Sequence, residues 1–394
     1  MAYEDASTGN TLTNLIPDLF LALDVVSREL TGMIPAVTID PRVARAAIGA
    51  TIYSPVAPAA TAGNVSPAPV PPDDGEQAIG NISLAITKSR YVPVRWQGEE
   101  SMQMNMVGGV GVLPIRAQQF AQAMRTLVNE IESDLCGLYV NASRAVVPND
   151  TSLFKTNLAD IANVRKILVD NGAPTSDLQC VIDTTAGAAL RTQANLTTVP
   201  ASGISMLDQG VLISPYGVKV RESAQIKTPD VGTEDSATTS TDNKAIGDTS
   251  IALAAAGTGT VVAGDLVTIA NTGDTTTQYV NKTLISAVSG ATLTINAPGL
   301  LKAITADTLA IAVRASGSRN LAFDRSAIVL ATRMPALPEG GDMASDRTTI
   351  TDPRTGLSFE VSMYKQYRQV RYEIAIAWGV KVVKEEHVAI LAGA

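Results

Sequence analysis

The sequence contains few of the residue types from which catalytic and metal sites are built. Its 394 residues include one histidine, His387, and two cysteines, Cys136 and Cys180. One histidine excludes histidine-based metal clusters and argues against a Ser-His-Asp triad, so we expect His387 to be an ordinary surface or edge residue. Two cysteines suit a reducing compartment better than a disulfide framework, and we expect both to be packing residues. We therefore predict no enzyme, with no catalytic residue, metal site or cofactor.

Charge and long apolar runs are also scarce. Charged residues make up 17% of the chain, with a net charge of −8. This net negative charge argues against sequence-independent binding of nucleic acid, which needs clustered Lys and Arg. The most apolar N-terminal run, residues 12–26, is interrupted by proline and charged residues and cannot span a bilayer. No secretory signal opens the chain, so we expect a soluble protein that folds inside the cell, away from membranes.

Aromatic residues make up only 4% of the chain, so its 45% of hydrophobic residues must build the core mainly from Ala, Val, Ile and Leu. One segment arranges them as a long helix. Over residues 114–142, apolar side chains recur at three- and four-residue steps: Met124, Leu127, Val128, Ile131, Leu135 and Leu138. Pro114 suits a first helical position. At about 1.5 Å per residue the helix would be roughly 40 Å long, which predicts a strut.

Two predicted strands flank a proline-rich segment that precedes the helix. Residues 42–54 and 82–96 have β-forming patterns, and residues 55–80 between them hold six prolines. A segment of that composition cannot form a core, and so long a connection is unusual inside a compact domain. We predict a hairpin that projects from the body and reaches something outside the subunit.

Acidic and basic groups in two places suggest a contact between subunits. The proline-rich segment carries Asp73, Asp74 and Glu76, which lack the alternating oxygen ligands of a calcium loop. They predict a solvated loop tip, or a patch that meets arginine on a neighbour. A mild basic cluster is predicted near the C-terminus, either as solvated strand ends or as the partner of acidic loops; it comprises Arg347, Arg354, Arg368 and Arg371.

The rest of the chain alternates between an α/β pattern and a pattern of short β-strands. Residues 151–222 read as an α/β module, with helices at 158–171 and 186–194 and strands at 178–182 and 212–220. Residues 223–318 are rich in Thr, Ala, Gly and Asp and contain five or six short β-runs between turns. This stretch predicts a small β-barrel or sandwich inserted into the module. The α/β pattern resumes at residues 320–333, and residues 357–383 are predicted to be extended.

In this order the segments resemble the major capsid (coat) proteins of tailed bacteriophages, and among them the podovirus branch that carries an inserted β-domain. Four passages carry the resemblance: residues 82–99, residues 164–190, residues 263–270, and residues 320–333 followed by 371–383 with a Trp378-Gly379-Val380 turn. The resemblance covers nearly all of the chain after residue 10.

The resemblance implies an α+β, Hong Kong 97-type capsid fold. It maps an N-terminal arm to residues 1–47, an extended-loop hairpin and peripheral-domain strand to 48–105, the spine helix of the peripheral domain to 106–150, the axial domain to 151–222 and 319–345, the inserted β-domain to 223–318, and long peripheral-domain strands returning to the axial domain to 346–394. On this map the polar face of the spine helix looks towards the lumen or an adjacent subunit, and it carries Arg116, Arg125 and Glu132.

The function implied by the resemblance is structural. Such a chain assembles with itself, as hexamers and pentamers, into the icosahedral head shell that encloses the double-stranded DNA genome, without sequence-specific binding. It implies a separate scaffolding protein, a portal protein at one vertex and a decoration protein as partners. It also implies assembly in the host bacterial cytoplasm and a final place in the virion. The expected intersubunit residues are Asp73, Asp74, Glu76, Arg354, Arg368 and Arg371.

Two other classes remain open at this point. An encapsulin-type nanocompartment would share the fold, but such chains are usually shorter and lack the β-insertion, so residues 223–318 speak against it. A Thr- and Ala-rich bacterial surface or adhesion protein would be expected to carry a signal peptide and repeated strands, and the sequence shows neither. An enzyme ranks last because no site is in view.

Overall fold

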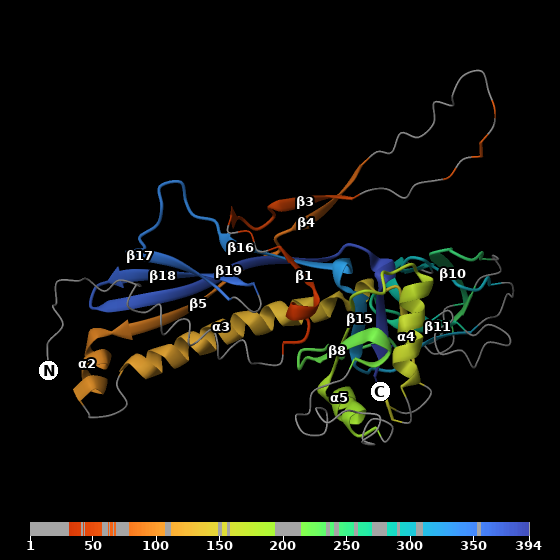
Figure 1. The fold of residues 1–394 in the computed structure, drawn as a ribbon, viewed down its shortest axis with the longest axis horizontal. Coiled ribbons are helices and arrows are strands. Elements are labelled where there is room, and N and C mark those ends of the chain that lie inside the picture. Colours follow the sequence, from red (N-terminus) through yellow and green to blue (C-terminus); the bar gives the residue numbers. More distant parts are fainter. Residues whose placement is uncertain are drawn as a thin grey trace.

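The protein is an elongated α+β molecule in which one long helix runs along most of one half (Figure 1). The computed structural model describes residues 31–40, 42, 44–56, 62, 64, 65, 67, 79–106, 112–148, 152–155, 158–193, 214–233, 237–239, 244–255, 259–269, 282–289, 292–304, 310–352 and 356–393. Most of the predicted N-terminal arm and of the proline-rich segment lies outside these residues.

The predicted long helix is confirmed as α3 (Val112–Cys136), which continues into a 3-10 turn, η3 (Gly137–Asn141). Its predicted apolar face is buried at every position within α3, and Leu138 in η3 is half-buried. α3 packs against a seven-stranded sheet of order β1-β16-β19-β18-β17, with β5 also paired to β19 and β2 to β16. The strands are β1 (Thr38–Asp40), β2 (Arg45–Ala46), β5 (Lys88–Gln97), β16 (Ile328–Pro335), β17 (Asp346–Thr351), β18 (Ser358–Gln366) and β19 (Gln369–Val382).

A polar contact fixes α3 against this sheet. The Asp134 carboxylate on α3 accepts hydrogen bonds from Lys88 Nζ at 2.8 Å and from the indole Nε1 of Trp378 at 2.9 Å. The Lys88 ammonium also lies 5.9 Å from the centre of the Trp378 ring. A buried indole N–H needs a hydrogen-bond acceptor. Asp134 supplies that acceptor for Trp378, the largest buried side chain of the sheet, and also pairs with the Lys88 ammonium. The contact sets the register of the helix on β5 and β19.

The second half holds a five-stranded sheet of order β6-β20-β15-β7-β8. Its strands are β6 (Arg144–Val146), β20 (Val388–Ala392), β15 (Arg319–Asp324), β7 (Leu178–Ile182) and β8 (Val218–Glu222). Two predicted helices are confirmed as α4 (Ala159–Asp170) and α5 (Thr184–Arg191). α5 begins two residues before the predicted start because Asp183 caps it, accepting the Ala186 N–H at 3.3 Å. Short 3-10 turns precede β8 and β20, namely η4 (Pro215–Gly217) and η6 (Glu385–His387).

Between β8 and β15 the chain leaves this sheet and forms a closed six-stranded barrel of order β10-β13-β12-β11-β14-β9. The strands are β9 (Ala237–Thr239), β10 (Ser250–Ala255), β11 (Leu266–Ile269), β12 (Lys282–Ser289), β13 (Thr292–Ile295) and β14 (Ala310–Val313). The barrel has its own core, built mostly of Ile, Leu and Val side chains. Of the two predicted arrangements, barrel or sandwich, the structure has the barrel. The wider division of the chain into domains stays a prediction.

The predicted hairpin is present, but its second strand is shorter than expected. β3 (Thr51–Val56) pairs only with β4 (Gly80–Ala85) among the described strands, and the pair stands off the seven-stranded sheet in Figure 1. The single strand predicted over 82–96 is wrong, because the chain changes sheets at Ile86 and Thr87 and continues as β5 beside β19. β5 then leads into helix α2 (Gly98–Met106).

The predicted Trp378-Gly379-Val380 turn is also wrong, because all three residues lie inside β19. A Cβ atom at Gly379 would stand 2.1 Å from the carbonyl oxygen of Ala85. The glycine is therefore there to let the end of β4 approach the strand closely, and it marks a crossing of two chain segments rather than a bend.

Glu132 contradicts the predicted polar outer face of the helix. Arg125 is exposed as expected, but the Glu132 side chain is only 1% exposed. Its carboxylate accepts the backbone N–H groups of Gly32 and Met33 at 2.7 Å and of Ile34 at 3.0 Å. These residues lead into a short turn, η2 (Ile34–Ala36). Helical spacing alone could not show this, because the donors come from a segment about 100 residues earlier.

Candidate intersubunit site

The predicted intersubunit residues fall into two sets. Asp73, Asp74, Glu76 and Arg354 lie outside the described residues, so their part stays a prediction. Arg368 and Arg371 are described, and both stand near the turn between β18 and β19. That turn forms one wall of a large groove.

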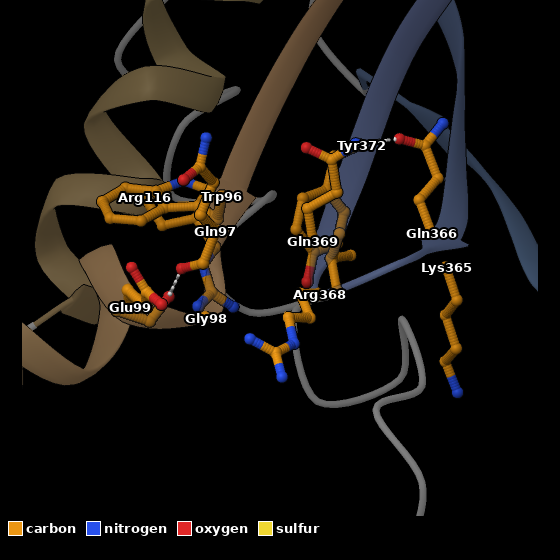
Figure 2. A pocket seen from close by; sticks show the side chains of 12 residues that line it. Trp96, Gln97, Gly98, Glu99, Arg116, Lys365, Gln366, Arg368, Gln369 and Tyr372 are labelled. Atoms are coloured by element: carbon orange, nitrogen blue, oxygen red, sulfur yellow. Dashed lines mark hydrogen bonds between the residues drawn. The ribbon is translucent and has the colours of Figure 1, made fainter.

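The groove has a volume of about 870 Å³ and lies where α2, the first turns of α3, the end of β5 and the β18–β19 turn meet. Figure 2 shows Trp96, Arg116 and Glu99 on one side and Lys365, Gln366, Arg368, Gln369 and Tyr372 on the other. The turn residue Arg368 has φ +53°, and its carbonyl accepts the Gly98 N–H at 3.0 Å. This hydrogen bond ties the turn to the start of α2 and holds the two walls together.

The floor of the groove is apolar and rigid. Tyr372 packs edge-to-face on Phe120, with ring centres 5.4 Å apart, a favoured aromatic geometry. Trp96 is buried, and its Nε1 donates to Gln119 Oε1 at 2.8 Å. Both rings are therefore held by α3, so the floor is formed before any partner arrives.

The rim of the groove is positively charged. The guanidinium of Arg116 lies 5.7 Å from the centre of the Tyr372 ring, and that of Arg368 lies 5.5 Å from the Tyr367 ring. Lys365 is exposed and adds a third cation, whereas Glu99 is the one carboxylate among the described residues that line the groove. Lys365 was not among the predicted intersubunit residues, and Arg116 was predicted only as part of a helix face that looks towards the lumen or an adjacent subunit. Their spacing in the sequence gives no signal, since the fold joins segments about 250 residues apart.

The predicted basic cluster is divided in the structure. Arg347 pairs with Asp342, and its Nε lies 2.6 Å from Glu360 Oε1. Arg371 Nη2 donates to Glu373 at 3.0 Å while its guanidinium lies 5.5 Å from the Tyr91 ring. Both cations therefore have a carboxylate partner within the subunit. Arg368 has no such carboxylate partner in the described part of the chain, and it belongs to the groove.

Other candidate groups are structural. Cys136 and Cys180 are buried free thiols, as predicted, and burial raises the pKa of each to about 12, so neither forms a thiolate at neutral pH. Within the described ranges, no group of three or more His, Cys, Asp or Glu side chains could hold a metal ion. No helix in that part of the chain is long and apolar enough to cross a membrane.

His387 contradicts the prediction of a surface or edge residue, since it is only 6% exposed and the strand that follows it, β20, lies inside the five-stranded sheet. It ends η6 just before β20 enters the five-stranded sheet, and its Nδ1 finds no hydrogen-bond partner among the described residues. Burial lowers the pKa of His387, and the charge of Lys384 lowers it further, against the opposing effect of Asp324 and Glu386. The neutral imidazole is therefore the form that fits the fold.

A pH dependence of stability follows from this burial. Between the lowered folded pKa and the ordinary value near 6.5, the unfolded chain binds more protons at His387 than the folded chain. The stabilisation is present above about pH 6.5 and is lost as the pH falls through the folded pKa. Relative to His387→Gln, the wild-type chain should lose free energy of unfolding between about pH 7.5 and 5.5 in urea titrations. Parallel pH profiles for the two proteins would contradict this.

Comparison with known proteins gives a likeness in structure only. No protein-family model and no curated protein matches the sequence. The capsid structure of cyanophage P-SCSP1u is similar at 11% identity and a TM-score of 0.48, over 91% of this chain and 86% of that one. A structure from Mycobacterium phage Che8 is similar at 13% identity and a TM-score of 0.45, over 99% of this chain and 94% of that one. The mature capsid of bacteriophage PhiM1 is similar at 11% identity and a TM-score of 0.44, over 100% of this chain and 90% of that one. At such identities and scores, the likeness assigns this chain neither a family nor a function.

Proposed function

We propose that this chain is the subunit of a closed protein shell, the head shell that encloses the double-stranded DNA of a tailed phage. The observation that carries the proposal is the β3–β4 hairpin, which its own subunit supports poorly. On one face Ile52 and Leu84 pack into a small cluster with Ile86, Ala331 and Ala377. On the other face Tyr53 is 68% exposed.

The hairpin also has two open edges. β3 and β4 form a two-stranded sheet in which each strand has only the other as a partner among the described strands. Isolated two-stranded sheets are marginal in water, and open edges favour pairing with another chain. Large exposed apolar residues lie on or close to the same hairpin in sequence: Ile48, Tyr53 and Ile79. Contacts on neighbouring subunits would cover what the subunit leaves open, as obligate assemblies do over about 2,000 Å² or more.

The finer features of the proposal follow the resemblance in the sequence. Copies of the chain would form hexamers and pentamers, with closed symmetry limiting growth. A separate scaffolding protein, a portal at one vertex and a decoration protein would be the other partners, and the barrel at residues 223–318 would mark the podovirus branch. A net charge of −8 suits a wall that does not trap a polyanionic genome.

Electron microscopy of the purified chain tests the proposal. We expect expression together with a phage scaffolding protein to yield uniform angular shells of phage-head size, whereas the chain alone should assemble less regularly. Small uniform shells would instead favour an encapsulin-type compartment. Subunits that stay monomeric under every condition would contradict both kinds of shell.

A further inference from the structure

Two segments of chain connect the barrel to the rest of the molecule. Residues 223–232 lead from β8 towards the barrel, and residues 314–319 return from β14 to the start of β15. We call these two segments the stem. They are tied to each other, because the Arg319 N–H donates to the Lys227 carbonyl at 2.9 Å. In Figure 1 the barrel strands β10 and β11 lie at the end of the molecule opposite α2, so a rotation in the stem re-aims the barrel as a unit.

One side chain of the stem is a buried cation without a partner. Arg319 is 0% exposed, and its Nε, Nη1 and Nη2 atoms have no hydrogen-bond partner among the described residues. Arginine keeps its charge at neutral pH, and a charge removed from water costs free energy unless it is paired. Burial lowers the pKa of Arg319, and repulsion from Arg314 lowers it further, against the opposing effect of Tyr139 and Asp265. Hydration of the guanidinium would remove this cost.

The carboxylate whose charge favours the Arg319 cation is already engaged. Asp265 belongs to the barrel side of the contact and is only 2% exposed. Its oxygens accept the Val262 N–H at 2.7 Å and the Gly232 N–H at 3.2 Å, and none of them is a hydrogen-bond partner of Arg319. Asp265 therefore holds a barrel loop to the stem but leaves the Arg319 guanidinium unpaired.

Other contacts hold the barrel against the body. Asn296, only 5% exposed, donates through Nδ2 to the carbonyl oxygens of Val140 at 2.7 Å and of Ala142 at 2.8 Å. Leu266 of β11 is fully buried in the same apolar cluster as the inner face of α3. The docked position of the barrel is therefore a balance between these contacts and the cost of the charge at Arg319.

From this balance we propose that the stem is a hinge, on which the barrel moves between the docked position and an open one in which the Arg319 guanidinium is hydrated. Both halves keep their cores during the movement, because the barrel has its own apolar cluster and β15 stays between β7 and β20. Opening gives up the Asn296 hydrogen bonds and the Leu266 contact, and it relieves the buried charge. The hinge is a property of the single subunit, so its test needs no assembled shell.

Native-state proteolysis of the full-length subunit measures the opening. The bond that follows Lys227 lies in the stem, where the Lys227 carbonyl is held by the Arg319 N–H, so trypsin should cut it only from the open form. The rate of this cut, followed by mass spectrometry, tracks the population of the open form when opening and closing are fast. Cutting after Arg333, which is 5% exposed within β16, reports global unfolding in the same experiment.

Three variants separate the charge of Arg319 from its shape. Arg319→Met removes the charge and keeps an unbranched side chain, so we expect it to slow the cut after Lys227 by about tenfold. Arg319→Lys, the matched control that keeps a charge, should stay closer to wild type than to Arg319→Met. Asn296→Ala loosens the docked position and should speed the cut by about tenfold. Cutting after Arg333 should change little in all three.

Distances between two spin labels test the movement itself. The labels are attached through Val169→Cys on α4 and Val288→Cys on the barrel, two exposed positions, while Cys136 and Cys180 are buried. We expect two label distances, one for each position of the barrel. The ratio of open to docked should fall about tenfold with Arg319→Met and rise about tenfold with Asn296→Ala.

Either measurement can overturn the hinge. A cut after Lys227 that Arg319→Met slows no more than Arg319→Lys does would overturn it, as would a single label distance shared by wild type and Asn296→Ala. Should Arg319→Met fail to fold, wild type and Asn296→Ala still decide. Equal cutting rates in these two proteins contradict the hinge, and faster cutting together with a larger open population supports it.

Discussion

Replacing residues 55–80 with Asn-Gly should leave a folded, soluble subunit that forms no shells. The structure explains why folding should survive. The apolar contacts of the hairpin with the body come from Ile52, Leu84 and Ile86, which all lie outside the replaced segment. Because Ser54 pairs with Ile82, the new connection Asn-Gly-Asn81 is a three-residue loop, a length that hairpins commonly use.

Shell formation should fail because, on the proposed function, the replaced segment supplies contacts to neighbouring subunits. Differential scanning calorimetry of the unassembled subunit and electron microscopy of the assembly reaction measure the two effects separately. We expect a melting temperature within a few degrees of wild type and no shells. Asp73→Asn/Asp74→Asn/Glu76→Gln, which keeps the length but removes the charge, should retain some assembly. Normal shells from the shortened chain would contradict the proposed role, and an unfolded subunit would show that the segment belongs to its own core.

Elements with a strong period were predictable from the sequence, whereas weakly patterned strands were not. α3 and α4 follow from helical spacing that is kept over many residues, and β7 follows from a short run of mostly apolar residues. The residue pattern did not predict β17 (Asp346–Thr351), although the resemblance assigned strands to residues 346–394, because β17 is largely polar, with only Ile350 buried. Its pairing with β18 supplies the order that its own residues do not encode. β9, with three residues, is too short to show any period.

Contacts between distant segments were the other class of miss. The groove joins Trp96 and Arg116 to Lys365, and the close approach at Gly379 depends on Ala85. The residues next to each of them in the sequence give no sign of these contacts. The charge of Arg368 was noticed, but which cations already have partners could be read only from three-dimensional distances.

Glu132→Ala should destabilise the subunit by about 3 kcal/mol or more, since each buried donor left without a partner costs about 1–3 kcal/mol. The substitution orphans the N–H groups of Gly32, Met33 and Ile34 at once. These groups lie in a segment between α3 and the five-stranded sheet, where a Cβ at Gly32 would stand 2.6 Å from the Glu222 carbonyl oxygen. Water cannot easily replace the carboxylate there, because Met33 and Ile34 are fully buried.

Glu130→Ala is the matched control for this prediction. Glu130 lies two residues earlier on α3, with a side chain 30% exposed, and pairs with Lys88 and Arg90 at the surface. Exposed pairs contribute about 0–1 kcal/mol, so denaturant titrations should show a small change for Glu130→Ala and a large one for Glu132→Ala. Glu132→Gln should fall between them, because an amide keeps one acceptor oxygen but turns a donor towards a donor. Equal losses for the two alanine variants would show that the contact does not hold the N-terminal segment to the helix. A large loss confined to Glu132 would show that this carboxylate anchors the segment Gly32–Ile34 to α3.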